Sequence, residues 1–273
     1  MINAGPSRIV LFLILTFALS AIVGLKMQLV FALMWCPGIA AIAVRLLFQR
    51  NLQGFGWRWR ATRLEIVSYL LPPALALVVY GAVWLTGLGG FQAAGLVSGR
   101  DLGHQLPLLA TILIRATVGF TGSAIFALGE EIGWRGFLVS ELAQLGTFAT
   151  TCWISGATWA VWHYPMILFA GYNSGTPKWF ALLVFTWMVV ASSFVYAWMR
   201  LRSGSLWTPV ILHASHNLFI QRIFDPLTTD RGLTNFVTTE FGVGLAIAYT
   251  ACALYCWRRR CDVPAACKRK IAF

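Results

Sequence analysis

Charged residues are scarce in this chain of 273 residues. They make up 11% of it, whereas a soluble domain typically carries about 25%. Hydrophobic residues make up 59%, and the mean hydropathy is +0.73. This balance excludes an ordinary soluble domain and indicates a polytopic membrane protein. We therefore expect an all-α helical bundle embedded in a membrane.

A separate soluble domain is also missing, because apolar segments follow one another closely. Crossing a membrane takes roughly 20 apolar residues per helix. Eight segments qualify, at about 8–25, 28–47, 66–89, 107–137, 150–170, 179–199, 205–222 and 241–257. The longest gap, Gly90–Gln105, is too short to fold alone, and no internal repeat is visible. We expect one transmembrane bundle over residues 1–257, followed by a basic tail over residues 258–273.

The net charge of +12 follows the expected topology and does not point to nucleic acid. With the N-terminus in the cytosol, fifteen of the 21 basic residues fall on the cytosolic side and five on the other. The remaining one, Arg115, lies within the fourth expected span. The positive-inside rule therefore predicts eight spans with both termini cytosolic. The basic tail, Arg258–Lys270, is expected to contact anionic lipid head groups.

The N-terminal segment allows two interpretations. Arg8, the apolar run Ile9–Ala18 and the small residues after it resemble a signal peptide. Cleavage there would leave seven spans. We favour an uncleaved anchor, because the charge bias is satisfied more simply when the first span is retained.

Ionisable groups that could do chemistry are few: the chain has nine carboxylates and four histidines. Within a membrane each costs at least about 2.5–3.5 kcal/mol, so such groups usually face a protein interior or a wet cavity. Three polar clusters nevertheless interrupt the fourth, fifth and seventh expected spans. They are Glu130-Glu131-Ile132-Gly133-Trp134-Arg135, His163, and His213-Ala214-Ser215-His216-Asn217.

Helical spacing predicts different roles for the two adjacent glutamates. Glu131 and Arg135 are four residues apart, so they share a helix face and can form an ion pair. Glu130 is 100° further round the helix and is free to point into a cavity. The alternative is that both glutamates cap a helix end in the head-group region.

The sequence favours a functional role for some of the four histidines more strongly than for others. His213 and Asn217 are four residues apart on one face, and His216 is only about 60° from His213, which favours a functional face. His163 alone fits a packing residue equally well. The neighbouring Trp159 either lines a cavity or packs against lipid or other helices. The fourth histidine, His104, lies in an expected external loop.

Together these groups permit peptide hydrolysis without a serine nucleophile. A glutamate can serve as the general base that activates water. Imidazole and the amide of Asn217 can donate hydrogen bonds to the oxyanion that forms at the carbonyl. The sequence lacks Gly-x-Ser-x-Gly, and its serines within the expected spans have no obvious base nearby.

At these residues the chain resembles the CPBP family of CAAX proteases and bacteriocin-processing enzymes, the group of the type II CAAX prenyl endopeptidase. The family pattern is Glu-Glu-x-x-x-Arg, then Phe-x-x-x-His, then His-x-x-x-Asn. Its first and third parts are complete here. In the second part Trp159 replaces the phenylalanine four residues before His163, which keeps an aromatic wall of different shape. The match runs from Glu130 to Asn217, about a third of the chain.

The resemblance implies an eight-helix intramembrane endopeptidase. It assigns water activation to Glu130 and His163, and oxyanion stabilisation to His213 and Asn217. It further implies that Glu131 and Arg135 support the site, and it gives His216 no role.

The family has been described both as metalloproteases and as glutamate proteases. Glu130, His163 and His213 would supply the ligands of a zinc site. However, His-Glu-x-x-His is absent, and the amide of Asn217 is a poor zinc ligand. We favour a metal-free mechanism without a cofactor and keep zinc as the alternative.

The expected substrate is a peptide or protein in or at the membrane. Short loops and a strong charge bias are typical of a multi-pass protein of the bacterial cytoplasmic membrane. Bacterial relatives are linked to bacteriocin processing, self-immunity or membrane-protein cleavage. One alternative is a non-enzymatic immunity or scaffold protein on the same fold. A transporter with a proton relay is less favoured, because such folds are often built from internal repeats.

Overall fold

The computed structural model describes residues 4–24, 30–60, 62–97 and 106–263. It is nearly all-α, as expected, with one correction: a two-stranded sheet joins two loops. Strand β1 (Gly89–Phe91) runs antiparallel to β2 (Thr228–Asp230), with Gly90 opposite Thr229. His104 and residues 264–273 of the basic tail lie outside the described residues.

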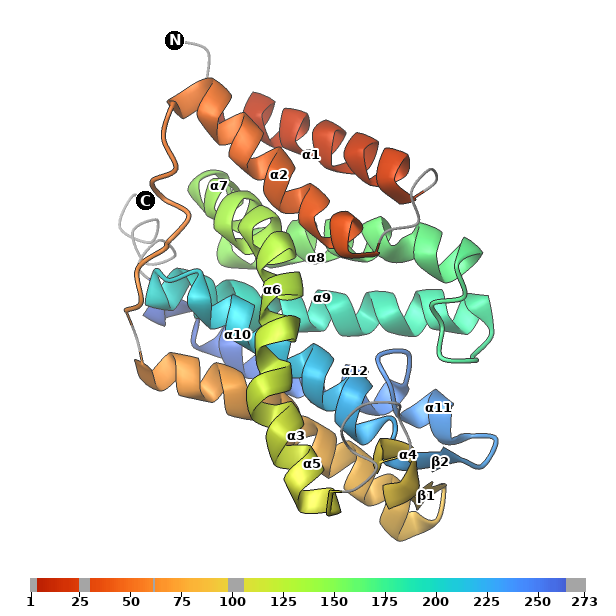
Figure 1. Cartoon of the computed structure of the whole chain (residues 1–273). Helices are drawn as coiled ribbons and strands as arrows, with labels where there is room; N and C mark the ends of the chain where they lie inside the picture. The colour runs from red at the N-terminus through yellow and green to blue at the C-terminus, as the bar shows by residue number, and fades with distance from the viewer. Residues whose placement is uncertain (1–3, 25–29, 61, 98–105, 264–273) are drawn as a thin grey trace.

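Helices form nearly all of the rest (Figure 1). The α-helices are α1 (Ala4–Ile22), α2 (Val30–Gln49), α3 (Thr62–Thr86), α4 (Ala93–Val97), α5 (Leu108–Ile114), α6 (Phe120–Glu131), α7 (Val139–Leu145), α8 (Phe148–Phe169), α9 (Lys178–Ser203), α10 (Trp207–His216), α11 (Thr234–Val237) and α12 (Val243–Arg258). Three π-helical segments, η3 (Arg115–Gly119), η4 (Ile132–Leu138) and η5 (Asn217–Phe224), and a 3₁₀ turn, η6 (Arg260–Asp262), complete them.

Among the described residues, five helical stretches are long and apolar enough to cross a membrane. They are α1, α2, α3, the continuous stretch from Leu108 to Leu145, and α9. The other three expected spans correspond to α8, to α10 with η5, and to the shorter α12. The count of eight spans and the cytosolic placement of the termini therefore stay predictions.

Helix α9 lies at the centre of the bundle. It is the most buried of the five stretches and packs against α8 on one side and α12 on the other (Figure 1). A helix that is apolar on most faces is expected in such a central position. Helix α9 also contacts both α8, which carries His163, and α10, which carries His213 and His216.

The stretch from Leu108 to Leu145 is 38 residues long, longer than the expected span of 107–137. Its α-helical turns are interrupted by η3 and η4, and η4 begins directly after Glu131. Two glycines let α2 cross closely at this point. A Cβ on Gly133 would lie 2.5 Å from Pro37 Cβ, and one on Gly129 would lie 2.8 Å from the Met34 carbonyl oxygen. Helix α2 thus braces the turn that carries both glutamates.

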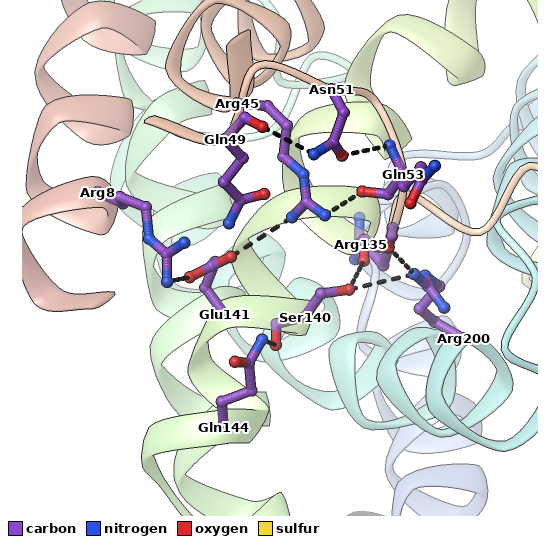
Figure 2. A network of polar contacts seen from close by, with 11 residues as sticks. Arg8, Arg45, Gln49, Asn51, Gln53, Arg135, Ser140, Glu141, Gln144 and Arg200 are labelled. Carbon is purple, nitrogen blue, oxygen red and sulfur yellow. Dashed lines mark hydrogen bonds and ion pairs between the residues drawn. The ribbon is translucent and has the colours of Figure 1, made fainter. Parts of the chain in front are cut away.

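A polar network fixes the far end of this stretch (Figure 2). Glu141 forms ion pairs with Arg8 of α1 at 2.9 Å and with Arg45 of α2 at 3.6 Å. Arg200 of α9 donates to Ser140 Oγ at 3.2 Å and to the Gly54 carbonyl at 3.0 Å. Four helices and the loop after α2 are therefore held together at the end of the bundle opposite the loops that carry β1 and β2.

Candidate active site

The four predicted catalytic residues line one cavity of about 460 Å³. Glu130 comes from the end of α6, His163 from α8, His213 from α10 and Asn217 from the start of η5. Of its exposed lining residues, Val30 begins α2, Ala170 and Gly171 directly follow α8, and Arg222 lies in η5. The cavity therefore opens at the end of the bundle opposite Arg8 and Arg45 and reaches inward to Glu130.

Glu130 points into this cavity and is only 2% exposed. Its Oε2 accepts a hydrogen bond of 2.8 Å from the indole Nε1 of Trp159. Its Oε1 lies 4.0 Å from His213 Nε2. One carboxylate oxygen is thus anchored, while the other faces the imidazole across a gap.

Glu131 and Arg135 form the predicted ion pair, with Arg135 Nη1 donating to Glu131 Oε1 at 2.7 Å. Both side chains are almost fully buried. The same oxygen also lies 2.9 Å from His213 Nδ1. Because a carboxylate oxygen accepts, Nδ1 carries the proton and Nε2 is the nitrogen that faces the cavity. Glu131 therefore fixes the orientation of His213.

Two aromatic rings hold the Arg135 guanidinium. Its central carbon lies 4.0 Å from the centroid of the Trp159 ring and 4.2 Å from that of the Tyr196 ring of α9. Both contacts are within the range of a cation–π interaction, which strengthens when the cation is removed from water. Trp159 thus contacts two residues of the Glu-Glu-x-x-x-Arg motif: its indole N–H donates to Glu130, and the face of its ring packs on Arg135.

His163 is oriented by its own helix. Its Nδ1 lies 2.9 Å from the carbonyl oxygen of Trp159, and a carbonyl can only accept, so Nδ1 carries the proton. In the neutral ring Nε2 therefore has the free lone pair. The rings of Trp162 and Phe185 pack on this imidazole, at centroid distances of 4.8 and 5.0 Å.

Asn217 and His216 differ although they are adjacent. Asn217 lines the cavity on the same face as His213, and it is partly exposed. His216 also borders the cavity, but its Nδ1 lies 2.9 Å from the Tyr249 hydroxyl of α12. That contact gives His216 a packing role between α10 and α12 and fits the absence of a family role.

The zinc alternative does not fit this arrangement of donors. Within the part of the chain that the structure describes, no three His, Cys, Asp or Glu side chains are grouped so that they could hold a metal ion. The 4.0 Å between Glu130 Oε1 and His213 Nε2 is wider than the spacing of two ligands that each lie about 2.0–2.2 Å from one tetrahedral zinc. We therefore derive no step through a metal.

Sequence reasoning missed three partners of the site. The hydrogen bond from Trp159 to Glu130 was not predicted, because the tryptophan was interpreted only as an aromatic wall. Tyr196 carries no motif and comes from a helix that sequence reasoning left out of the site. Glu240 lines the cavity from the turn before α12, and its only sequence signal was the scarcity of carboxylates.

Trp159→Phe should distinguish the packing role of the Trp159 ring from its hydrogen bond to Glu130. Phenylalanine keeps a ring over Arg135 but leaves Glu130 Oε2 without its indole donor. Loss of a hydrogen bond to a charged group costs about 1.5–3 kcal/mol of stability. Misplacement of a catalytic group can lower kcat by up to about 10²-fold. We expect a lower melting temperature and a lower kcat with little change in KM.

Trp198→Phe is the matched control, because this buried indole donates to the Arg259 carbonyl oxygen at 3.1 Å and not to a motif residue. It should lose some stability but keep kcat. A wild-type kcat in Trp159→Phe would show that the indole does not orient Glu130.

A buried carboxylate, buried imidazoles and a partly exposed amide thus line one cavity within an apolar helical bundle. Residues 105–219 match the family model of the Rce1-like type II CAAX prenyl endopeptidases. This region contains all three motifs, so the resemblance to the CPBP family is confirmed over these residues, and the match supports a CAAX-type endopeptidase. The family and the apolar helices together indicate an integral membrane protein. No curated protein matches the chain.

Proposed function

We propose that this protein is an intramembrane endopeptidase that hydrolyses a peptide bond of a membrane-associated peptide or protein. One observation carries the proposal: a carboxylate, two imidazoles and an amide from separate helical segments line a single cavity. A protein that only binds a partner has no need of a base and oxyanion donors in one place. The roles below are those that the geometry favours.

Glu130 acts as the general base. It removes a proton from a water molecule, and the resulting hydroxide attacks the scissile carbonyl carbon. His163 Nε2, which has a free lone pair when Nδ1 donates to Trp159, accepts a second hydrogen bond from that water. When the tetrahedral intermediate collapses, Glu130 returns its proton to the departing amine, so the enzyme ends in its starting state.

His213 and Asn217 stabilise the oxyanion. The Asn217 amide is a donor in any protonation state. His213 already donates through Nδ1 to Glu131, so its Nε2 donates only when the ring carries both protons. Before the proton transfer the Glu130 and Glu131 carboxylates compensate the positive charge of that form, and after it the oxyanion replaces the charge that Glu130 has lost. This arrangement gives Glu131 a function beyond its ion pair with Arg135.

The position of the cavity mouth bears on the substrate. The mouth lies at the end of the bundle opposite Arg8 and Arg45, which belong to the more basic side. With the orientation expected from the positive-inside rule, it faces the non-cytosolic side. This favours an exported or membrane-embedded polypeptide as substrate, in a bacterial cytoplasmic membrane. Purified protein tested against a library of membrane peptides is the direct experiment.

Asn217→Ala should lower kcat by about 10²–10³-fold, the usual loss when one oxyanion donor is removed. KM should change little, because the donor acts mainly in the transition state. Asn235→Ala is the matched control: its amide bonds to Ser174 and Asp230 outside the cavity, so kcat should stay at the wild-type value. A wild-type kcat in Asn217→Ala would remove that residue from the mechanism.

Chelation tests the metal-free mechanism. Activity should survive prolonged chelator treatment, and the purified enzyme should hold no stoichiometric metal. One zinc per chain, lost in both His163→Ala and His213→Ala but kept in Asn217→Ala, would overturn the metal-free mechanism. The assignment as a protease would still stand.

A further inference from the structure

A second carboxylate lies in the same cavity as Glu130, and the mechanism does not use it. Glu240, in the turn before α12, lines the cavity and is 6% exposed. Its Oε2 accepts a hydrogen bond of 2.5 Å from the Tyr172 hydroxyl, and its Oε1 accepts one from Gln221 Nε2. These two donors hold the carboxylate in a fixed orientation.

Unlike Glu131 and Glu141, Glu240 forms no ion pair with an arginine or a lysine of the described residues. Glu131 pairs with Arg135, and Glu141 pairs with Arg8 and Arg45. None of the ion pairs within the described residues includes Glu240. Burial raises the pKa of the Glu240 carboxyl, and the hydrogen bonds from Tyr172 and Gln221 oppose that rise. A buried carboxylate without a counter-ion is costly, so a cation that entered the cavity would be stabilised there.

Glu240 is close to the chemistry but separated from it. The ring of Tyr172, whose hydroxyl donates to Glu240, lies nearly parallel to the ring of His163, with centroids 6.2 Å apart. One aromatic ring therefore separates this carboxylate from a predicted catalytic group. That spacing suits the recognition of a side chain near the scissile bond. Each Glu240 oxygen also keeps acceptor capacity beyond the single bond that it receives.

We propose that Glu240 is a specificity-determining residue that binds a cationic group of the substrate, either a lysine or arginine side chain or a free amino terminus. The inference rests on the proposed protease function and adds a substrate class to it. An entering cation forms an ion pair with Glu240 and need not displace one supplied by the described residues. Tyr172 and Gln221 keep the carboxylate in place for it.

A rival role for Glu240 is to position His163 through Tyr172. The two roles predict different kinetics. A positioning role lowers kcat for every substrate alike, whatever its charge. Cation recognition changes the ratio of kcat/KM between charged and neutral substrates and leaves cleavage of the neutral ones nearly unchanged.

The test uses full-length protein in detergent and matched fluorogenic peptides. The peptides differ at one position, scanned along both sides of the scissile bond, which carries lysine, acetyl-lysine or glutamate. Parallel peptides with free and acetylated amino termini distinguish the two sources of the cation. At one position, or at the amino terminus, kcat/KM should be at least about 10-fold higher for the cationic form than for its acetylated match.

Variants assign that preference to Glu240. Glu240→Gln should abolish it, and Glu240→Lys should reverse it in favour of glutamate. Asp230→Asn is the matched control, since it removes an exposed carboxylate from the same end of the protein and should leave the preference intact. Tyr172→Phe removes a donor to Glu240 but no charge, so the preference should persist. Equal loss of activity on all peptides in Glu240→Gln would establish the positioning role and overturn the proposal.

A binding measurement keeps the inference independent of turnover. In the Glu130→Gln background, the dissociation constant of the cationic peptide should be at least about 10-fold lower than that of its acetylated match, and Glu240→Gln should erase the difference. If wild type cleaves no peptide while this difference persists, the proposed function fails and the cation site stands. If wild type cleaves or binds cationic and acetylated peptides equally well, the proposed cation site is wrong. This outcome is measured on the wild-type protein and does not depend on the folding of any variant.

Discussion

Glu130→Gln is expected to abolish peptide cleavage while the protein still folds and inserts. The substitution keeps the shape of the side chain and an oxygen that can accept the hydrogen bond from Trp159. It removes the group that takes the proton from water. A general base typically contributes about 10²–10⁴-fold to the rate, which would bring cleavage to the background level. Quantified cleavage of a fluorogenic peptide, with the melting temperature in detergent as a check on folding, measures this effect.

The same experiment addresses the non-enzymatic alternative. A scaffold or immunity protein would show no cleavage in wild type, and Glu130→Gln would then leave its function in cells unchanged. Equal cleavage by wild type and Glu130→Gln would rule out Glu130 as the base. Glu141→Asp serves as a control, because it perturbs a buried glutamate paired with Arg8 while leaving the cavity unchanged.

Arg135→Leu should have the largest effect on stability. It strands the fully buried Glu131 carboxylate and removes the cation held between Trp159 and Tyr196. Breaking a buried pair by removing one partner costs about 3–5 kcal/mol. Glu131→Gln should be similarly destabilising, because it leaves Arg135 without its carboxylate and His213 without an ionised partner. Thermal unfolding in detergent and the yield of folded protein measure both effects.

The contrast with an exposed pair makes this prediction specific. Arg202 lies 3.7 Å from Asp262, and both side chains are partly exposed, so Arg202→Leu should cost no more than about 1 kcal/mol through that pair. If Glu131→Gln and Arg135→Leu were both fully stable but inactive, these residues would belong to the chemistry and not to its support.

Features that depend on local spacing could be predicted from the sequence. The pair of Glu131 and Arg135 follows from four-residue helical spacing. The common face of His213 and Asn217 follows from the same rule, even though an α-to-π transition separates them. The continuation of the helix from 137 to Leu145 was missed, because the polar residues Ser140, Glu141 and Gln144 suggest an end, whereas α7 continues the helix through them.

Contacts between distant segments could not be predicted in this way. Nothing in the sequence around Trp159 indicates that its indole reaches a carboxylate 29 residues earlier. Tyr196 joins the site only because α9 packs against α8, and Glu240 only because the turn before α12 contacts Tyr172 in the loop after α8 and Gln221 of η5. The sheet of β1 and β2 was missed for a similar reason: the strands are three residues long, have no pattern of their own and pair across the chain, with Gly89 opposite Asp230.

The ion pair of Glu131 and Arg135 has a consequence for biosynthesis. Its two charges lie about one turn apart on a single helix, so they can neutralise each other as soon as that helix forms, without any contact from Trp159, Tyr196 or His213. The segment can then enter the lipid with its net charge reduced, which lowers the cost of integration. Glu130 has no such partner within its own helix and gains its indole donor only when α8 arrives. Insertion into the membrane and completion of the site are thus successive events along the chain.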